Sequence, residues 1–540
     1  MTRPRQIGLW AALIAITVFA AHLPSFFHPL LDGDEAIYGS IAALMNTGGQ
    51  LYGSGGVDNK PPGIFWVYAV TFRATGTYEM TAVHALGLVV IAATCVLLFM
   101  IGRHIASVRV GLLAALFYGV LTAAGNPRLL AANTELFMML PLTASVLLML
   151  RRRWLWSGVL LVAAGAFRQV AAVNVLLAIV GIAWLEPPAN RWRASTSFAG
   201  GMAAALVVGA LILLLSGSLP GFWRWTVSSL YGYASSTWVS SYVWERARDS
   251  IVLFVVNMLV LWIAAIAVTT RWRRLDIKER LVVVWLAVAM VGSIAAGHLS
   301  WHYFIQAMGP LALAAALCFE RFTLSRWVVS VAALGIALPT IGWWAFNFEA
   351  DPLTYDSNSP TVPQHQSVAA YIHDRTSPGQ RVFVWGNWPA LYVESGRLMA
   401  SRFPGFLRGF ARGSGLPPNN WDTTPDVWPQ LQSDLEAHPP ALIIDTAAAG
   451  WSDFSSYPMS NYPVLAELVA SRYHEVATVD GVVIYAPNSP LVGSWLPGSF
   501  DLEDRGFRGR DRNQPIEHPG RLGRFGSLRQ PNVGRRSIRE

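Results

Sequence analysis

The sequence predicts a mainly α-helical membrane protein, a helical bundle that crosses the bilayer many times and carries a small C-terminal α/β domain. Of its 540 residues, 53% are hydrophobic and only 13% are charged, which is too apolar for an ordinary soluble domain. Apolar runs long enough to cross the hydrocarbon core, roughly 20 residues each, recur up to about residue 348. Beyond that point the composition is that of a soluble chain, beginning with Pro352, Pro360 and Pro363.

The apolar runs predict a bundle of about eleven transmembrane helices. Single spans are expected at 8–26, 81–101, 108–124, 134–150, 197–215, 251–270, 281–297, 303–319 and 327–347. The run 154–186 must cross twice, because the basic clusters on its two sides belong in one compartment. Each of these two passes is short for a bilayer, so the pair is expected to be partly re-entrant, with Arg168 and Gln169 near its outer turn.

Basic clusters between the spans set the expected orientation, because Arg and Lys favour cytoplasmic loops. The clusters are Arg3 with Arg5, 103–109, 151–153, Arg191 with Arg193, 271–280 and 321–326. The large loops 27–80 and 216–250, and the chain after residue 348, are then extracytoplasmic. We therefore expect a multi-pass protein of the cell membrane, in which the net charge of +8 reflects topology and not nucleic-acid binding.

Composition divides the chain into three predicted parts: a transmembrane domain over 1–348, a soluble extracytoplasmic domain over 349–489 and a tail over 490–540. The soluble part shows helices at 365–375 and 464–472, strands at 381–385 and 441–445, and a hairpin over 474–479 and 482–486. The hairpin turns at Asp480-Gly481, a dipeptide that suits a type I′ turn. The tail is rich in Gly, Pro, Arg and Asp, which predicts disorder.

The first outer loop places three acids, Asp32, Asp34 and Glu35, directly after a predicted span. A carboxylate beside a cavity at the membrane face can act as general base on an acceptor hydroxyl or amine, or can hold a divalent ion. The alternative is that these acids only cap the amphipathic helix predicted over 36–45, which would lie along the membrane interface.

A lysine follows in the same loop at a constrained position. In Lys60-Pro61-Pro62-Gly63, a rigid turn holds the ammonium just before an aromatic run that contains Trp66. A fixed ammonium at this depth suits a lipid phosphate. The lysine therefore favours a functional site over simple helix capping.

Three motifs in this loop carry a family resemblance: Asp34-Glu35-Ala36 with Tyr38, Gly49 with Leu51 and Tyr52, and Lys60-Pro61-Pro62-Gly63 with Trp66. Together they resemble the first outer loop of the GT-C glycosyltransferases of the protein O-mannosyltransferase and lipid A aminoarabinose transferase superfamily. The resemblance implies a polyprenyl-phosphate sugar as donor and an inverting transfer. It also implies that Asp34 is the catalytic base, that Glu35 acts beside it, and that Lys60 contacts the donor phosphate.

Two charged segments further along the chain extend this resemblance. Arg128 and Glu135 resemble an arginine and an acid that precede the fourth span in that family, although members often carry Asp where this chain has Glu135. Glu135 could instead be a simple charge at a helix N-terminus. Arg168-Gln169 interrupts an apolar run, which indicates a functional site because intramembrane charge is costly; a snorkelling arginine is the alternative. Arg128 and Arg168 are expected to bind the donor phosphate with Lys60.

A late segment, 297–303, contains His298 and His302, a spacing that could bind a metal. The segment also resembles a His-Tyr element of the same family, which implies that His302 and Tyr303 line the donor cavity. The predicted lining of the substrate cavity is Tyr38, Glu135, Gln169, His302 and Tyr303.

The sequence therefore favours a hexosyl- or pentosyltransferase that moves sugar from a polyprenyl phosphate to an extracytoplasmic protein, glycan or lipid. No cofactor is required, because the lipid phosphate is itself the leaving group, and a divalent metal at the acids stays open. The competing class is a transporter or flippase of a lipid-linked sugar. Transporters tend to place their site at the bilayer midplane between repeated halves. Here the candidate residues cluster at one face and no repeat is visible, so the enzyme is favoured.

Overall fold

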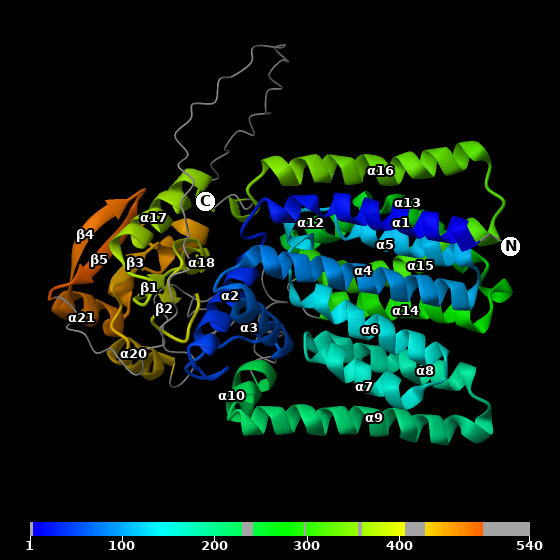
Figure 1. The fold of residues 1–540 in the computed structure, drawn as a ribbon, viewed down its shortest axis with the longest axis horizontal. Helices are drawn as coiled ribbons and strands as arrows, with labels where there is room; N and C mark the ends of the chain where they lie inside the picture. Colours follow the sequence, from blue (N-terminus) through cyan, green and yellow to red (C-terminus); the bar gives the residue numbers. More distant parts are fainter. Residues whose placement is uncertain (1–3, 229–240, 296–298, 355–358, 406–426, 490–540) are drawn as a thin grey trace, which may run out of the picture. The chain divides into compact units, whose positions relative to one another are not determined.

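A computed structural model describes residues 4–228, 241–295, 299–354, 359–405 and 427–489. Most of the described chain is helical, and a small sheet lies near its C-terminal end (Figure 1). Four described helices are long and apolar enough to cross a membrane: α4 (Met80–Ile105), α9 (Pro188–Leu215), the joined η6 (Trp301–Phe304) and α15 (Ile305–Arg321), and α16 (Arg326–Glu349). The predicted class, a polytopic helical membrane protein with a small α/β part, is confirmed.

Further apolar helices are shorter or bent. They are α1 (Pro4–Ala21), α5 (Val108–Leu121), α6 (Thr134–Leu150), α7 (Trp154–Gly165), η3 (Gln169–Asn174), α8 (Val175–Leu185), α12 (Ser241–Asn257), α13 (Leu259–Thr270) and α14 (Ile277–Ala295). The apolar part of α12 and α13 together could form one more span, with a bend of 79° between them. Each predicted span overlaps one of these helices, but the count of about eleven crossings stays a prediction.

Helix α15 forms the centre of the bundle and packs against α5, α13 and α14. In the most apolar stretch of η6 and α15, 94% of the residues are buried. The corresponding stretch of α16 has no buried residue, as expected for a helix that faces lipid. Helices α4 and α5 approach closely at Gly102 and Gly111. A Cβ on Gly102 would lie 2.6 Å from the Cα of Gly111, so only glycine fits there.

The run 154–186 is broken near its middle, where a turn was expected; that it crosses the membrane twice stays a prediction. Helix α7 ends at Gly165 and η3 begins at Gln169, with Arg168 in an extended backbone conformation between them. At this break the carbonyl of Ala166 accepts from the N–H of Gly63, and Arg168 places a charged side chain inside an otherwise apolar region. The break therefore places Arg168 where it can take part in the candidate site.

Two helices occupy the first outer loop: α2 (Gly33–Asn46) and α3 (Gly63–Thr75). Helix α2 packs on α3 and on α18 (Ala390–Ser395), and most of its residues are buried. That α2 lies along the membrane interface stays a prediction. Gly39 of α2 lies where the helix meets both neighbours, Phe72 of α3 and Val393 of α18. A Cβ on Gly39 would meet the side chains of Phe72 and Val393 at 3.6 Å.

The C-terminal sheet has the order β2-β1-β3-β5-β4. Its strands are β1 (Arg381–Trp385), β2 (Leu398–Met399), β3 (Leu442–Asp445), β4 (Tyr473–Val479) and β5 (Val482–Pro487). Strand β1 runs parallel to β2 and β3, and β5 runs antiparallel to β3 and β4. Helices α17 (Val362–Arg375), α20 (Val427–Ala437) and α21 (Pro463–Arg472) accompany α18 in this part of the chain.

Every predicted element of the soluble part has a counterpart, and Asp480 and Gly481 both have positive φ, as a type I′ turn requires. The sequence did not reveal β2, which is only two residues long, or α18 and α20. Residues 490–540, where disorder was expected, lie outside the described residues. The domain boundary between residues 348 and 349 stays a prediction.

A buried histidine ties α17 to its neighbours. His365 Nδ1 lies 3.0 Å from Glu394 of α18, and its Nε2 lies 3.7 Å from Asp351, just after α16. Its ring also packs against Trp388, with centroids 5.9 Å apart. Burial lowers the pKa of His365, but the two carboxylates outweigh burial and raise it to about 9. His365 is therefore a cation at neutral pH.

We expect this ion cluster to make stability depend on pH. The pKa of His365 is higher in the folded chain than its ordinary 6.5, so its stabilisation is complete below that value and is lost as the pH rises through about 9. The melting temperature of the detergent-solubilised protein should thus fall from neutral to alkaline pH, and it should fall less steeply in His365→Gln. His474→Gln, at an exposed position, should follow the wild type. Parallel curves for wild type and His365→Gln would contradict this assignment.

Candidate functional site

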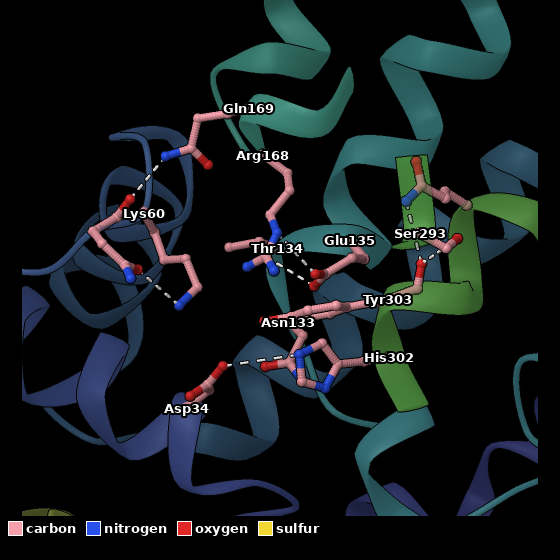
Figure 2. A network of polar contacts seen from close by, with 12 residues as sticks. Asp34, Lys60, Asn133, Thr134, Glu135, Arg168, Gln169, Ser293, His302 and Tyr303 are labelled. Atoms are coloured by element: carbon pink, nitrogen blue, oxygen red, sulfur yellow. Dashed lines mark hydrogen bonds and ion pairs between the residues drawn. The ribbon is translucent and has the colours of Figure 1, made fainter. Parts of the chain in front are cut away.

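Charged and polar side chains from five separate segments converge at one place (Figure 2). The segments are the start of α2, the turn before α3, the region from η2 (Pro127–Leu129) to the start of α6, the break before η3, and η6. Figure 2 shows Asp34 and Lys60 directed toward a common region, with Arg168 and His302 on its other side. The chain thus gathers most of the predicted site residues from loops and helix ends.

Asp34, in the first turn of α2, is the most open acid of the group. Its side chain is 30% exposed, against 9% for Asp32 and 1% for Glu135. The hydroxyl of Tyr38 donates to its Oδ2 over 3.3 Å. Burial raises the pKa of Asp34, but the ammonium of Lys60, followed by other cationic groups, outweighs burial and brings the pKa below its ordinary value. Asp34 is therefore an accessible carboxylate.

Asp32 lies deeper in the same cluster; it is one of the three acids noted in the first outer loop, but the sequence assigned it no role of its own. It has the N-cap position of α2 but makes no capping hydrogen bond with its side chain. Instead its carboxylate accepts from Asn133 Nδ2 at 3.0 Å and lies 3.7 Å from Arg128 Nε. The capping interpretation therefore does not describe Asp32, which orders the Arg128 side chain beside Asp34.

Glu35 points away from this cluster and is fully buried. Its carboxylate accepts from the backbone N–H of Leu31 at 2.7 Å and of Ala132 at 2.6 Å, and lies 3.1 Å from Nε2 of His84. Both carboxylate oxygens are thus used to hold the start of α2 against α4 and against the loop before α6. Glu35 therefore has a structural role: it holds these three segments together.

Lys60 is held by its own loop and by the second outer loop. Its Nζ donates to Asn59 Oδ1 at 3.1 Å and lies 3.8 Å from the buried Asp58. Its carbonyl accepts from the hydroxyls of Tyr52 at 2.7 Å and Thr226 at 3.4 Å. Burial lowers the pKa of Lys60, but Asp58 and then Asp34 raise it above its ordinary value. Lys60 therefore keeps its proton and its positive charge at neutral pH.

Gln169 also holds this loop. Its Nε2 donates to the carbonyl of Asn59 at 2.8 Å and to that of Thr226 at 3.4 Å. Thr226 belongs to η4 (Trp223–Ser228), a π-helix in the second outer loop that follows α10 (Leu219–Phe222). Gln169 thus links the helix break, the Lys60 turn and the second outer loop.

The last position of the Lys-Pro-Pro-Gly turn, Gly63, has no room for a larger residue. The N–H of Gly63 donates to the carbonyl of Ala166 at 2.8 Å, at the break after α7. A Cβ on Gly63 would lie 2.7 Å from that oxygen, closer than any side chain tolerates. Glycine therefore lets the turn that carries Lys60 sit directly against the segment that carries Arg168.

Arg168 is paired inside the protein. Its Nε lies 3.0 Å from Glu135 Oε1, and its guanidinium lies over the ring of Tyr303, 4.3 Å from the centroid. Thr134 donates to the other oxygen of Glu135 at 2.8 Å. Arg168 is only 5% exposed, so the snorkelling alternative does not fit. Glu135 is more than a charge at a helix N-terminus, because it orients this guanidinium.

His302 completes the cluster. Its Nδ1 lies 3.6 Å from Asp32 and its Nε2 lies 4.0 Å from Asp34. One ligand atom from each of Asp32, Asp34 and His302 lies within 4.8 Å of the others, close enough to share a metal ion. His298, the second histidine of the predicted metal pair, lies outside the described residues.

No protein-family model matches the sequence, and no curated protein matches it. Among solved structures, the fold is similar to ArnT from Cupriavidus metallidurans bound to undecaprenyl phosphate, with a TM-score of 0.59, 14% identity, and coverage of 92% of this chain and 100% of ArnT. It is also similar to the archaeal oligosaccharyltransferase AglB from Archaeoglobus fulgidus in complex with an inhibitory peptide and a dolichol-phosphate, with a TM-score of 0.51 and 11% identity over 89% of this chain and 75% of AglB.

A third similar structure is the arabinofuranosyltransferase AftD from Mycobacteria, with a TM-score of 0.50 and 16% identity over 90% of this chain and 40% of AftD. At such identities the likeness establishes fold alone. The predicted resemblance to the GT-C glycosyltransferases is therefore confirmed as a shared fold.

Proposed function

We propose that this protein is a glycosyltransferase that moves a sugar from a polyprenyl-phosphate donor to an acceptor, with inversion at the anomeric carbon. The observation that carries the proposal is the pairing of one accessible carboxylate, Asp34, with the retained ammonium of Lys60 in a cluster that also holds Arg128 and Arg168. The shared fold supports it, because ArnT is bound to undecaprenyl phosphate and AglB to a dolichol-phosphate.

In this mechanism Asp34 takes the proton from an acceptor hydroxyl or amine. The freed electron pair attacks the anomeric carbon, and the bond from that carbon to the phosphate oxygen breaks. The polyprenyl phosphate leaves with the bonding electrons. Lys60, Arg128 and Arg168 stabilise the charge that develops on it, as preorganised cations do in a site shielded from water.

The neighbouring residues take supporting roles in this proposal. Glu35, expected beside the base, becomes a positioning residue, since both of its oxygens hold backbone and His84. Glu135 orients Arg168, and Gln169 orients the Lys60 turn. Tyr38 lies beside Asp34, and His302 and Tyr303 line the space next to it (Figure 2).

We further propose that the site faces the extracytoplasmic side of the cell membrane. The basic clusters between spans support this orientation, because they favour the cytoplasm and leave loops 27–80 and 216–250 on the opposite side. The acceptor would then be a protein, a glycan or a lipid outside the cytoplasm.

A transporter of lipid-linked sugar is the second candidate. Broken helices are typical of transporter sites, and this chain has a break at Arg168 and a 79° bend between α12 and α13. The two functions differ in chemistry, since a transporter moves the donor intact whereas a transferase cleaves it. Loss of labelled sugar from the lipid therefore separates them.

Membranes that contain the full-length chain, incubated with a panel of labelled polyprenyl-phosphate sugars, should release label from at least one donor lipid. Asp34→Asn removes the proton acceptor while keeping the side-chain shape, so turnover should fall by roughly 10²–10⁴-fold. Asp276→Asn is a matched control at a 78% exposed side chain. Normal turnover by a folded Asp34→Asn protein would show that Asp34 is not the base.

Chelation should leave this turnover in place. Three cationic side chains already face the phosphate in the proposed mechanism, so no metal is needed to stabilise the leaving group. Adding EDTA to the same membranes is expected to change the rate by less than about twofold, which is a negligible free energy. Loss of activity on chelation, with recovery on adding back a divalent ion, would instead assign Asp32, Asp34 and His302 as a metal site.

A further inference from the structure

Arg402, in the segment after β2, is held by hydrogen bonds to both oxygens of one carboxylate, that of Asp434. Arg402 Nη2 donates to Asp434 Oδ1 at 2.7 Å, and its Nε and its own backbone N–H both donate to Asp434 Oδ2, at 2.9 and 2.8 Å. A carboxylate bound at both oxygens by one guanidinium has little rotational freedom. Because the backbone N–H of Arg402 shares this carboxylate, the orientation of the peptide at Arg402 is fixed as well.

The carbonyl of Arg402 reaches the first outer loop. It accepts from the N–H of Val57 at 3.0 Å, and the Val57 side chain is fully buried. Val57 immediately precedes Asp58, which accepts from the N–H of Lys60 at 2.9 Å and lies 3.8 Å from its ammonium. A short path of hydrogen bonds therefore runs from Asp434 to Lys60.

The next residue reaches the second outer loop. Phe403 is buried, and its ring packs edge-on against Trp225 with centroids 6.2 Å apart. Trp225 immediately precedes Thr226, whose hydroxyl donates to the Lys60 carbonyl and whose own carbonyl accepts from Gln169. Two consecutive residues of the C-terminal part thus contact the two segments that hold Lys60.

We propose that Arg402 and Phe403 are positioning residues for Lys60, so that the C-terminal part of the chain supports the donor-phosphate site from behind Val57 and Trp225. The inference rests on the proposed function in one respect, the contact of Lys60 with the donor phosphate. Displacing Val57 or Trp225 moves the turn that carries the ammonium, and a cation that is misplaced binds phosphate less well. The C-terminal part thus supports the donor site from outside the membrane bundle.

The test uses the full-length chain in detergent and radiolabelled undecaprenyl phosphate as the probe. Asp434→Asn removes the charge that holds Arg402, and Phe403→Leu removes the ring contact with Trp225. Each should raise the dissociation constant roughly tenfold, the effect of losing one well-placed contact. Asp374→Asn, an exposed acid on α17, is the matched control and should bind as the wild type.

The decisive comparison is made in a Lys60→Met background. If Arg402 and Phe403 act through Lys60, their variants should change binding less than about twofold once the ammonium is gone. Amide hydrogen exchange at residues 57–60 should also be faster in Asp434→Asn than in Asp374→Asn, a readout that needs no ligand. Unchanged binding in both variants, or an equal tenfold loss without Lys60, would overturn the proposal.

Failure of this inference can be told apart from failure of the proposed function. Binding of undecaprenyl phosphate requires no sugar transfer. A protein that binds the lipid through Lys60 but releases no label from any donor would refute the transferase and leave Arg402 and Phe403 as positioning residues. A protein that releases label while Asp434→Asn and Phe403→Leu bind normally would refute only the positioning role.

Discussion

The structure depends on the pairing of buried charges in and beside a membrane bundle. An unpaired ion in such surroundings costs several kcal/mol or more, so each charge needs a partner of opposite sign. Arg168 is stable inside the helical part because Glu135 faces it, and Arg128 because Asp32 does. These pairs come from different segments, so satisfying them forces the helix break, the η2 turn and the start of α2 into one place.

Pairing also decides which groups remain available for a ligand. Glu35 has both oxygens occupied by backbone N–H groups and His84, and Asp32 is shared between Asn133 and Arg128. Asp34 differs because its side chain stays 30% exposed and its partners lie at longer distances. Adjacent positions on one helical turn point about 100° apart, so two neighbouring acids can serve opposite purposes. One anchors the chain, and the other faces the open side.

Local patterns in the sequence predicted the parts of this arrangement that local chemistry controls. Apolar runs located the helices, Asp480-Gly481 located the hairpin, and the Lys-Pro-Pro-Gly turn marked Lys60. Long-range partners left no such pattern. Thr226 is an ordinary loop residue in sequence, and its contact with Lys60 exists only because the fold brings together two residues that are 166 positions apart. The burial of α2 could not be predicted for the same reason, since part of the surface that covers it belongs to α18.

A rigid turn alone cannot fix the position of Lys60. Pro61 and Pro62 restrict the backbone next to Lys60, but they leave the whole turn free to pivot about its ends. Contacts from outside the turn remove that freedom: Gly63 rests on Ala166, Gln169 holds the Asn59 carbonyl, and Tyr52 with Thr226 holds the Lys60 carbonyl. The contacts of Arg402 and Phe403 stand one step further out, behind Val57 and Trp225. The ammonium that we propose as the contact of a lipid phosphate is thus held by parts of the chain that lie outside the helical bundle as well as by the bundle itself.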